Sequence, residues 1–315
     1  MGREQPPLPS GAMLDIGRGT LAFGMQLPIQ TQTTLLASEW EAHATPADLM
    51  RIAQAADRSG YLYVAVCDHV AIPRDRAAAM SLWWQDTLTT LGYLAAGTEH
   101  VGLLSHVYVL AYRHPLVVAK GFATLDHLSG GRAIVGVGTG HVEGEFDALG
   151  VPFAERGRIT DEKLPQLADA LEHTYVGDVG ALPRPLQSPR PPIWIGGSGR
   201  PALCRAAHYD GWLPQGPATA EAIATIAAFR EALCRDDRPF TVGHVLTAPV
   251  HVGTPTFDLG RPCLTGSSEQ IAEAVRAEVP TEVSQVQVRF AAASAAGYAE
   301  QVEAFGTEVG PLLGQ

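Results

Sequence analysis

Short apolar runs alternate with longer alanine-rich segments of helical periodicity along most of this chain, and this alternation constrains the fold more than any other feature. The pattern is typical of strand–helix units arranged around a parallel sheet. Thr45 and Pro46 resemble an N-cap followed by proline at the first helical position, and Ser59 and Gly60 resemble a helix end. Eight runs are predicted to be strands: 21–27, 61–66, 101–110, 132–137, 192–195, 211–214, 241–251 and 284–290.

Eight strands favour a closed (β/α)8 barrel, the TIM-barrel fold of the α/β class, although a doubly wound open sheet would give the same alternation. The length of 315 residues suits one such barrel, and 46% hydrophobic residues allow a large core. We therefore predict a flexible tail over 1–18 and a single barrel domain over 19–315. Two stretches, 143–161 and 175–192, are predicted to be insertions in loops on the C-terminal face of the barrel.

Charge and cysteine usage narrow the class of protein. A formal net charge of -11 argues against a nucleic-acid partner, because a phosphate-binding surface needs clustered Lys and Arg. Cys67, Cys204, Cys234 and Cys263 are scattered without a paired spacing, which indicates reduced thiols and neither a disulfide framework nor a metal site. The sequence shows no signal peptide and no run of about 18 apolar residues, so we expect a cytoplasmic protein that does not enter a membrane.

Asp68 and His69 follow the predicted strand 61–66 after a single residue, Cys67. In a parallel barrel the carboxyl end of a strand faces the active site, so both side chains are expected at the barrel mouth. Imidazole suits proton transfer near neutral pH, and a carboxylate beside it can fix its tautomer. The alternative is that the pair only caps the next helix.

Two glycine-rich runs follow other predicted strands. The run GVGTG at 136–140 is followed by His141, and its spacing does not fit the dinucleotide-binding fingerprint. It is interpreted either as a close approach to a flat ring or as a turn that leaves a tightly packed strand. The run IGGSGR at 195–200 leads into a predicted helix, where free N–H groups, a hydroxyl and an arginine form a candidate phosphate cradle.

Polar residues also interrupt the third predicted strand and its exit. His106 is interpreted either as a satisfied core residue or as a participant in the site. Arg113 is expected either to bind an anion or to pair with a carboxylate. Trp40, Trp83 and Trp84 are expected to line an apolar cavity or to serve in packing.

Several of these segments together resemble the luciferase-like monooxygenase superfamily. The segments 113–132, 136–140 and 145–157 carry the likeness, and 68–73 and 195–199 fall at the expected places. The Asp–His pair is similar to that of the branch that uses the deazaflavin coenzyme F420. The resemblance implies a homodimer and a non-prolyl cis peptide between Ser105 and His106.

The resemblance also implies roles for individual residues. His69 is then a general acid or base near the deazaflavin C5, with Asp68 at the ring, and His141 exchanges protons with the substrate. The cofactor is expected to contact Asp68, Ser105, His106, Gly138, Thr139, Gly140, Gly196, Gly197, Ser198, Gly199 and Arg200. His141 stands where sugar-phosphate dehydrogenases of this branch place a Glu, which argues against glucose 6-phosphate as the substrate.

The sequence thus predicts an F420-dependent oxidoreductase that transfers a hydride between the deazaflavin C5 and a small organic molecule. The alternative is a monooxygenase that uses oxygen and FMNH2, with FMN as cofactor and a flavin or F420 reductase as an indirect partner. A third alternative is a non-catalytic flavin-binding or storage protein on the same barrel.

Overall fold

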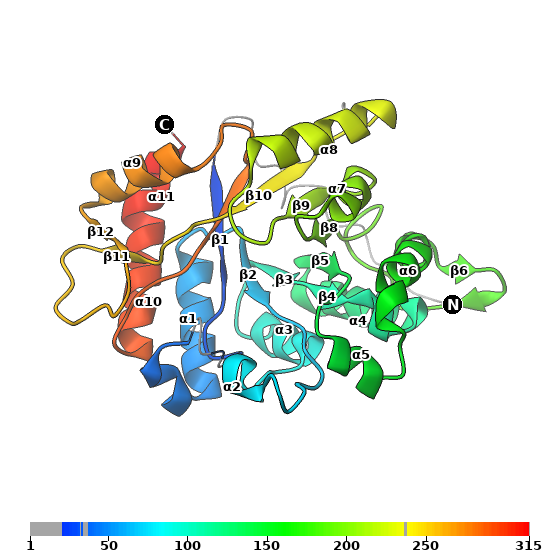
Figure 1. Ribbon diagram of the computed structural model, residues 1–315, viewed down its shortest axis with the longest axis horizontal. Coiled ribbons are helices and arrows are strands. Elements are labelled where there is room, and N and C mark those ends of the chain that lie inside the picture. Colours follow the sequence, from blue (N-terminus) through cyan, green and yellow to red (C-terminus); the bar gives the residue numbers. More distant parts are fainter. Residues whose placement is uncertain (1–20, 32, 34–36, 236–237, 315) are drawn as a thin grey trace.

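The computed structural model describes residues 21–31, 33, 37–235 and 238–314, so the tail predicted at 1–18 lies outside the described residues. Figure 1 shows the arrangement of the elements. The strands are β1 (Ala22–Gln26), β2 (Tyr63–Val66), β3 (Gly102–Ser105), β4 (Tyr108–Val109), β5 (Ala133–Gly138), β6 (Tyr175–Val176), β7 (Val179–Gly180), β8 (Ile193–Gly196), β9 (Gly211–Leu213), β10 (Thr241–Val245), β11 (Val250–Val252), β12 (Leu264–Gly266) and β13 (Gln285–Val288). The α-helices are α1 (Pro46–Arg58), α2 (Ala77–Met80), α3 (Thr87–Ala95), α4 (Pro115–Ser129), α5 (Glu143–Ala148), α6 (Arg156–Glu172), α7 (Arg200–Ala207), α8 (Ala220–Ala232), α9 (Ser268–Glu278), α10 (Ala295–Ala304) and α11 (Gly310–Leu313).

The main sheet closes on itself. Its strands follow the order β3-β2-β1-β13-β10-β9-β8-β5-β4, and β3 also pairs with β5, which completes the ring. All pairs within this sheet are parallel. Because β3 and β4 are two parts of one interrupted strand, the barrel has eight strand positions, and the predicted (β/α)8 barrel is confirmed.

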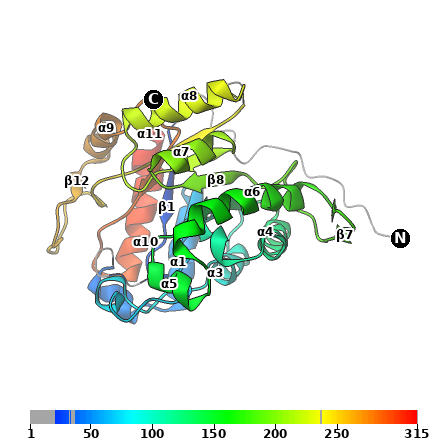
Figure 2. The ribbon, with the colours of Figure 1, turned by 45° about the vertical axis from the view of Figure 1, so that its right-hand side comes forward.

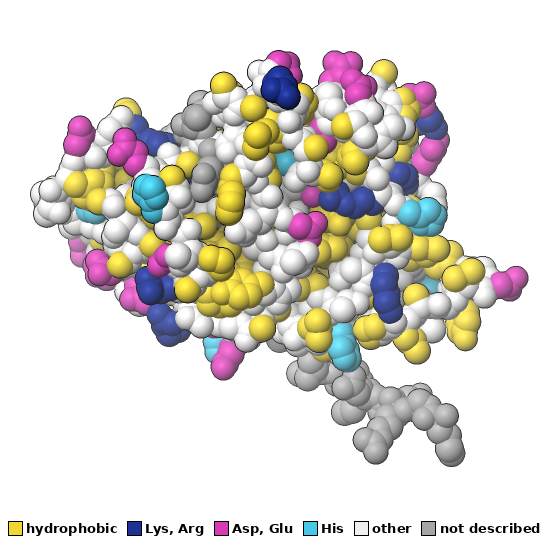
Figure 3. Space-filling model, turned by 90° about the horizontal axis from the view of Figure 1, so that it is seen from below, with side chains coloured by type: hydrophobic (Ala, Val, Ile, Leu, Met, Phe, Trp, Pro, Cys, Tyr) yellow, Lys and Arg dark blue, Asp and Glu magenta, His cyan; other side chains and the backbone are white. Residues whose placement is uncertain are grey.

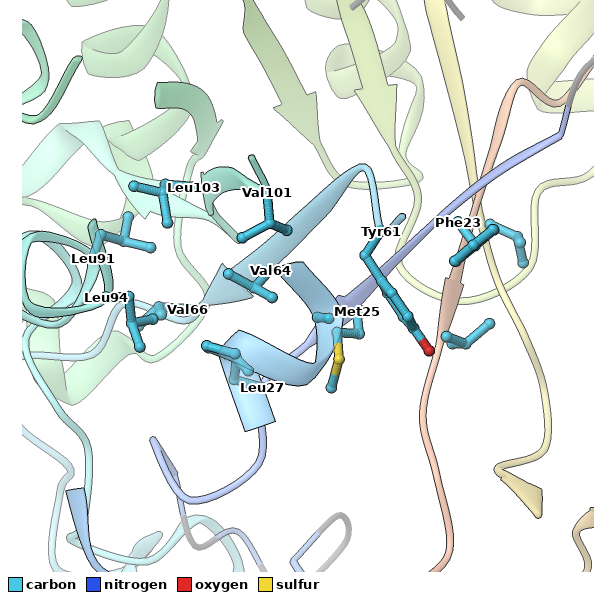
Figure 4. Close-up of a cluster of buried hydrophobic side chains, with 14 of the residues drawn as sticks. Phe23, Met25, Leu27, Tyr61, Val64, Val66, Leu91, Leu94, Val101 and Leu103 are labelled. Atoms are coloured by element: carbon cyan, nitrogen blue, oxygen red, sulfur yellow. The ribbon is translucent and has the colours of Figure 1, made fainter. Parts of the chain in front are cut away.

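Alternate side chains of each strand point into the barrel or out toward the helices, as the pleat of a strand requires. Inside lie the buried side chains of Tyr63, Leu104 and Trp194. Outside, Val64 and Leu103 pack in the layer between strands and helices that Figure 4 shows. Burying each large apolar side chain contributes about 1.5–3 kcal/mol, so this two-layer core stabilises the barrel.

The barrel interior is filled around Tyr63. Its hydroxyl donates a hydrogen bond to Oε1 of Gln285 at 2.8 Å. A side chain at Gly24 would place its Cβ 2.4 Å from the Tyr63 ring, so glycine in β1 provides the room that the ring occupies. The interior below the mouth is therefore a packed core, as is usual for such barrels.

Local signals set the helix starts. Thr45 caps α1 through a reciprocal capping box with Asp48, and Pro46 takes the first helical position, as predicted. Ser267 caps α9 in the same way with Gln270. None of the described helices is both long and apolar enough to cross a membrane.

The predicted insertion at 175–192 is not on the C-terminal face, and this part of the prediction is wrong. The segment follows α6 and precedes β8, so it lies at the amino end of the strands and contains the β6–β7 hairpin. The backbone N–H groups of Leu186 and Gln187 donate to the buried carboxylate of Asp126 at the end of α4. The physical reason is the order of elements, because in a βα barrel a helix-to-strand connection returns to the end opposite the mouth.

The predicted strand at 241–251 is two strands. β10 ends at Val245, and β11 leaves the barrel to pair in parallel with β12. Figure 2 shows β12 and the β6–β7 hairpin on opposite sides of the molecule. The connection from β10 to α9 is therefore an excursion on the C-terminal face. The sequence pattern did not distinguish β11, which belongs to this excursion, from the barrel strand β10.

Candidate functional site

A cavity of about 520 Å³ lies at the carboxyl ends of the barrel strands. This end of the molecule carries α2 and α5 along the lower edge of Figure 1, and Figure 3 views the molecule from below, where hydrophobic side chains are mixed with both signs of charge. The cavity brings together most of the residues predicted to form the site: Asp68, His69, His106, Gly138, Thr139, Gly140, His141, Gly196 and Gly197.

His69 is held by a buried carboxylate that sequence reasoning did not identify. Its Nδ1 lies 2.9 Å from Oε2 of Glu145, whose side chain is 0% exposed. Glu145 also accepts hydrogen bonds from the Tyr112 hydroxyl at 2.9 Å and from the backbone N–H groups of Val70 and Ala71. Glu145 stands in α5, which begins directly after the glycine run, and an acidic first turn at that place was the available signal.

Glu145 is ionised, and this fixes the tautomer of His69. Burial alone would raise the pKa of Glu145, but the hydrogen bonds from His69 and the N–H groups of Val70 and Ala71 hold it below its ordinary value. An ionised carboxylate only accepts hydrogen bonds, so Nδ1 of His69 must carry the proton. In the neutral imidazole Nε2 then keeps a lone pair that no described residue uses and that can accept a proton in the cavity.

Two further rings surround His69. Trp84 lies with its ring centroid 4.3 Å away, and the imidazole of His141 packs edge to face at 5.5 Å. Burial, followed by the nearby His69, lowers the pKa of His141. Both imidazoles therefore stand at one wall of the cavity, with His141 neutral at neutral pH and able to accept a proton.

Asp68 points to a different partner from His69. Its carboxylate forms a bidentate pair with the Arg113 guanidinium, at 2.6 and 2.8 Å, and accepts the Val109 N–H at 2.8 Å. The Asp68 side chain is 2% exposed. Of the two alternatives for Arg113, the structure shows the pair with a carboxylate, and this pair ties the end of β2 to the segment after β4.

The interruption between β3 and β4 carries the cis peptide. It joins His106 and Val107, one residue beyond the predicted position between Ser105 and His106. The Val107 side chain fills the space beside two glycines, because a Cβ at Gly138 would lie 2.2 Å from it and one at Gly196 2.6 Å from it. These glycines therefore leave room for the bulge, and the bulge forms the floor of the cavity.

Ser105 does not line the cavity. It is fully buried, its hydroxyl donates to the Gly136 carbonyl at 2.9 Å, and it accepts the Gly136 N–H at 3.0 Å. Its side chain thus links β3 to β5 and offers no atom for a cofactor.

The candidate phosphate cradle is only partly free. The Gly197 N–H already donates to the Leu213 carbonyl, and the Ser198 hydroxyl accepts the Gln215 N–H. Arg200 lies over the ring of Phe229, 5.2 Å from its centroid. Among the described residues, nothing accepts the N–H groups of Ser198, Gly199 and Arg200, so these three groups at the start of α7 remain available to an anion.

The fold and this cavity define a class of protein, a (β/α)8 barrel with His69, His141 and two glycine-rich segments at its mouth. The family described as luciferase-like monooxygenase matches residues 21–258, and the chain belongs to that family. The predicted family is thereby confirmed, and the cofactor branch within it stays a prediction.

Three comparisons illustrate the range of relatives. Protein y4wF of Sinorhizobium fredii is 30% identical over 201 residues, 61% of this chain and 54% of that protein. The FMNH2-dependent dimethylsulfone monooxygenase of Pseudomonas putida is 30% identical over 174 residues, 51% of this chain and 46% of that protein. The chain thus spans about half the length of these two relatives. The F420-dependent tetrahydromethanopterin reductase of Methanopyrus kandleri shares the fold with a TM-score of 0.70 at 18% identity, covering 93% of this chain and 99% of that one.

Proposed function

We propose that this protein is an F420-dependent oxidoreductase that transfers a hydride between the deazaflavin C5 and an organic substrate with an alcohol or carbonyl group. The observation that carries the proposal is the His69–Glu145 pair beside His141 at the cavity. Interconversion of an alcohol and a carbonyl transfers one proton at oxygen for every hydride at carbon. Two imidazoles at one wall of the cavity can accept and donate that proton.

The cavity offers polar groups that fit a flavin-like ring. The Nδ1 atom of His106 and the Oε1 atom of Gln287 are buried and have no hydrogen-bond partner among the described residues. Both residues line the cavity, and a ring edge that carries carbonyl and N–H groups would pair with such atoms. The three free N–H groups at Ser198, Gly199 and Arg200 suit a phosphate at the other end of the same ligand.

A bound deazaflavin supplies the hydride acceptor or donor at its C5. His69 receives the hydroxyl proton of the substrate at Nε2, and Glu145 stabilises the imidazolium that forms. In the reverse direction His69 returns this proton to the carbonyl oxygen. His141, neutral at neutral pH, binds the same oxygen or relays the proton to solvent.

A second candidate is a monooxygenase that uses FMNH2 and oxygen. Similarity to the dimethylsulfone monooxygenase of Pseudomonas putida, which is named for FMNH2, favours it. The same cavity and the same free N–H groups suit FMN, so the two candidates differ in the cofactor that binds and in the need for oxygen.

Equilibrium binding of F420 and of FMN, followed by fluorescence, separates the candidates. We expect F420 to bind and its reduced form to be consumed without oxygen in the presence of a carbonyl substrate. Tight FMN binding with negligible F420 binding would refute the F420 proposal. His69→Ala is expected to lower turnover by ~100-fold or more with cofactor affinity unchanged. His173→Ala, at the exposed histidine that directly follows α6, is the matched control.

A further inference from the structure

A second cavity of about 580 Å³ adjoins the first at the C-terminal face. Gln26 and Arg289 line both cavities, so these two side chains stand at the border between them. The second cavity lies between the segment after β1, the excursion between β10 and α9, and the segment after β13. The proton-transfer site uses none of the residues found only in this second cavity.

Arg289 is a cation that has no counter-ion among the residues that the structure describes. It directly follows β13, and its backbone is fixed because its carbonyl accepts the Val250 N–H of β11 at 2.8 Å. Among the described residues, no carboxylate lies within 4.0 Å of its guanidinium and no hydrogen bond of its side chain is found. Burial, followed by the nearby cation Arg261, lowers the pKa of Arg289.

Three acidic residues line the same cavity, the exposed Glu39 together with Glu41 and Asp258, and none of them forms an ion pair with Arg289 within 4.0 Å. Glu41 is buried, and its two oxygens accept the backbone N–H groups of Ile29 and Ser38, both at 2.8 Å. Asp258 accepts the Gly260 N–H at 2.9 Å. A half-buried guanidinium that no carboxylate of the described residues neutralises is costly to maintain, which favours a bound anion as its partner.

Two further donors of the wall have no partner. The Oγ1 atom of Thr31, a residue 5% exposed, and the Nε1 atom of Trp40 are buried and unpaired among the described residues. Thr31 and Trp40 line the same cavity as Arg289, so three of its lining residues carry groups that can donate hydrogen bonds. Such a set matches a ligand group with several acceptor oxygens and a negative charge.

We propose that Arg289, with Thr31 and Trp40, binds an oxyanion of the substrate, a carboxylate, sulfonate or phosphate. The substrate then spans the border between the cavities, with its anionic end in the second cavity and its reacting carbon beside His69 in the first. This inference rests on the proposed function for the identity of the ligand as substrate. The anion-binding site itself stands on the geometry of Arg289.

The test measures binding of benzoate, methanesulfonate and inorganic phosphate to the whole protein by calorimetry, with neutral benzamide as the comparison ligand. We expect at least one anion to bind, and Arg289→Gln to weaken it roughly 10- to 100-fold while weak benzamide binding stays unchanged. Trp40→Phe keeps the ring and removes one donor, so it should weaken the same anion less. Arg51→Gln, at an exposed arginine of α1, is the control.

Two results would overturn the proposal. One is that none of the three anions binds the unaltered protein, or that Arg289→Gln leaves their affinities unchanged. The other is that Arg289→Gln weakens F420 or FMN binding instead, since the anion would then belong to the cofactor. Failure of F420 to bind the unaltered protein refutes the proposed function alone, and the anion measurements remain a separate result.

Discussion

Replacing Glu145 with glutamine tests whether this carboxylate sets the proton on His69. In the unaltered protein Glu145 accepts four hydrogen bonds, two at each oxygen, from Val70, Ala71, His69 and Tyr112. The amide can keep its oxygen toward the two backbone N–H groups only by turning its NH2 toward His69 and Tyr112. Nδ1 of His69 must then accept a hydrogen bond, and the ring proton moves to Nε2.

The variant should lose activity more than stability. Nε2 of His69 would carry a proton in the resting state, so it could no longer accept one from the substrate, and turnover should fall by ~100-fold or more. Charge-assisted hydrogen bonds give way to neutral ones, which we expect to cost about 2 kcal/mol of unfolding free energy. For a chain of this size that corresponds to a melting temperature roughly 3 °C lower.

Nitrogen NMR of the histidine rings gives a direct readout. With 15N-labelled histidine, long-range proton correlations distinguish Nδ1–H from Nε2–H, and we expect His69 to change from the first form to the second in Glu145→Gln. Glu143→Gln, at an exposed glutamate of the same helix, serves as the control. An unchanged His69 tautomer together with unchanged turnover would refute the reasoning.

Three other perturbations follow from the geometry of the site. Asp68→Asn should lower the unfolding free energy by about 2–4 kcal/mol, because it leaves the partly buried Arg113 without its bidentate partner, and denaturant unfolding that shows no loss would contradict this. Gly138→Ala should destabilise by about 1–3 kcal/mol through its contact with Val107, and the added change Val107→Ala should restore much of that stability in the same assay. Burial lowers the pKa of His106 from 6.5 to about 4, so the stability that the neutral imidazole provides is fully present above pH 6.5 and is lost as the pH falls through about 4. In urea unfolding across this range, the unfolding free energy of His106→Gln should depend less on pH than that of the unaltered protein. An equal pH dependence in the two proteins would contradict the lowered pKa.

The strands could be predicted because a parallel barrel buries both faces of each strand. β5 is buried at every position from Ala133 to Gly138, and β2 likewise from Tyr63 to Val66, so each reads as a short continuous apolar run. The single strand predicted at 241–251 was wrong because the short-run pattern does not show which strands belong to the barrel. β11 adds two valines around His251, and nothing local in the sequence shows that this strand leaves the barrel to pair with β12.

Most residues predicted for the site line one cavity, but their pairings could not be predicted. The partner of His69 lies 76 positions away at Glu145, and that of Asp68 lies 45 positions away at Arg113. Such pairs depend on the closure of the barrel, which brings the ends of β2, β4 and β5 to one mouth. Local spacing can indicate that a strand end carries polar residues, but it cannot say which of them will meet.

The two residues of the Asp68–His69 pair have different partners, and neither is the N-cap of α2 or α3, the helices that follow. The Asp68 carboxylate does not orient the imidazole of His69 beside it. Asp68 turns to Arg113 and anchors the loop after β4, while His69 turns to Glu145 and the cavity. The anchored loop holds Tyr112, which donates the second hydrogen bond to Oε2 of Glu145. Asp68 therefore supports His69 indirectly, through the position of Tyr112, and a variant of Asp68 should affect catalysis only as far as it displaces that loop.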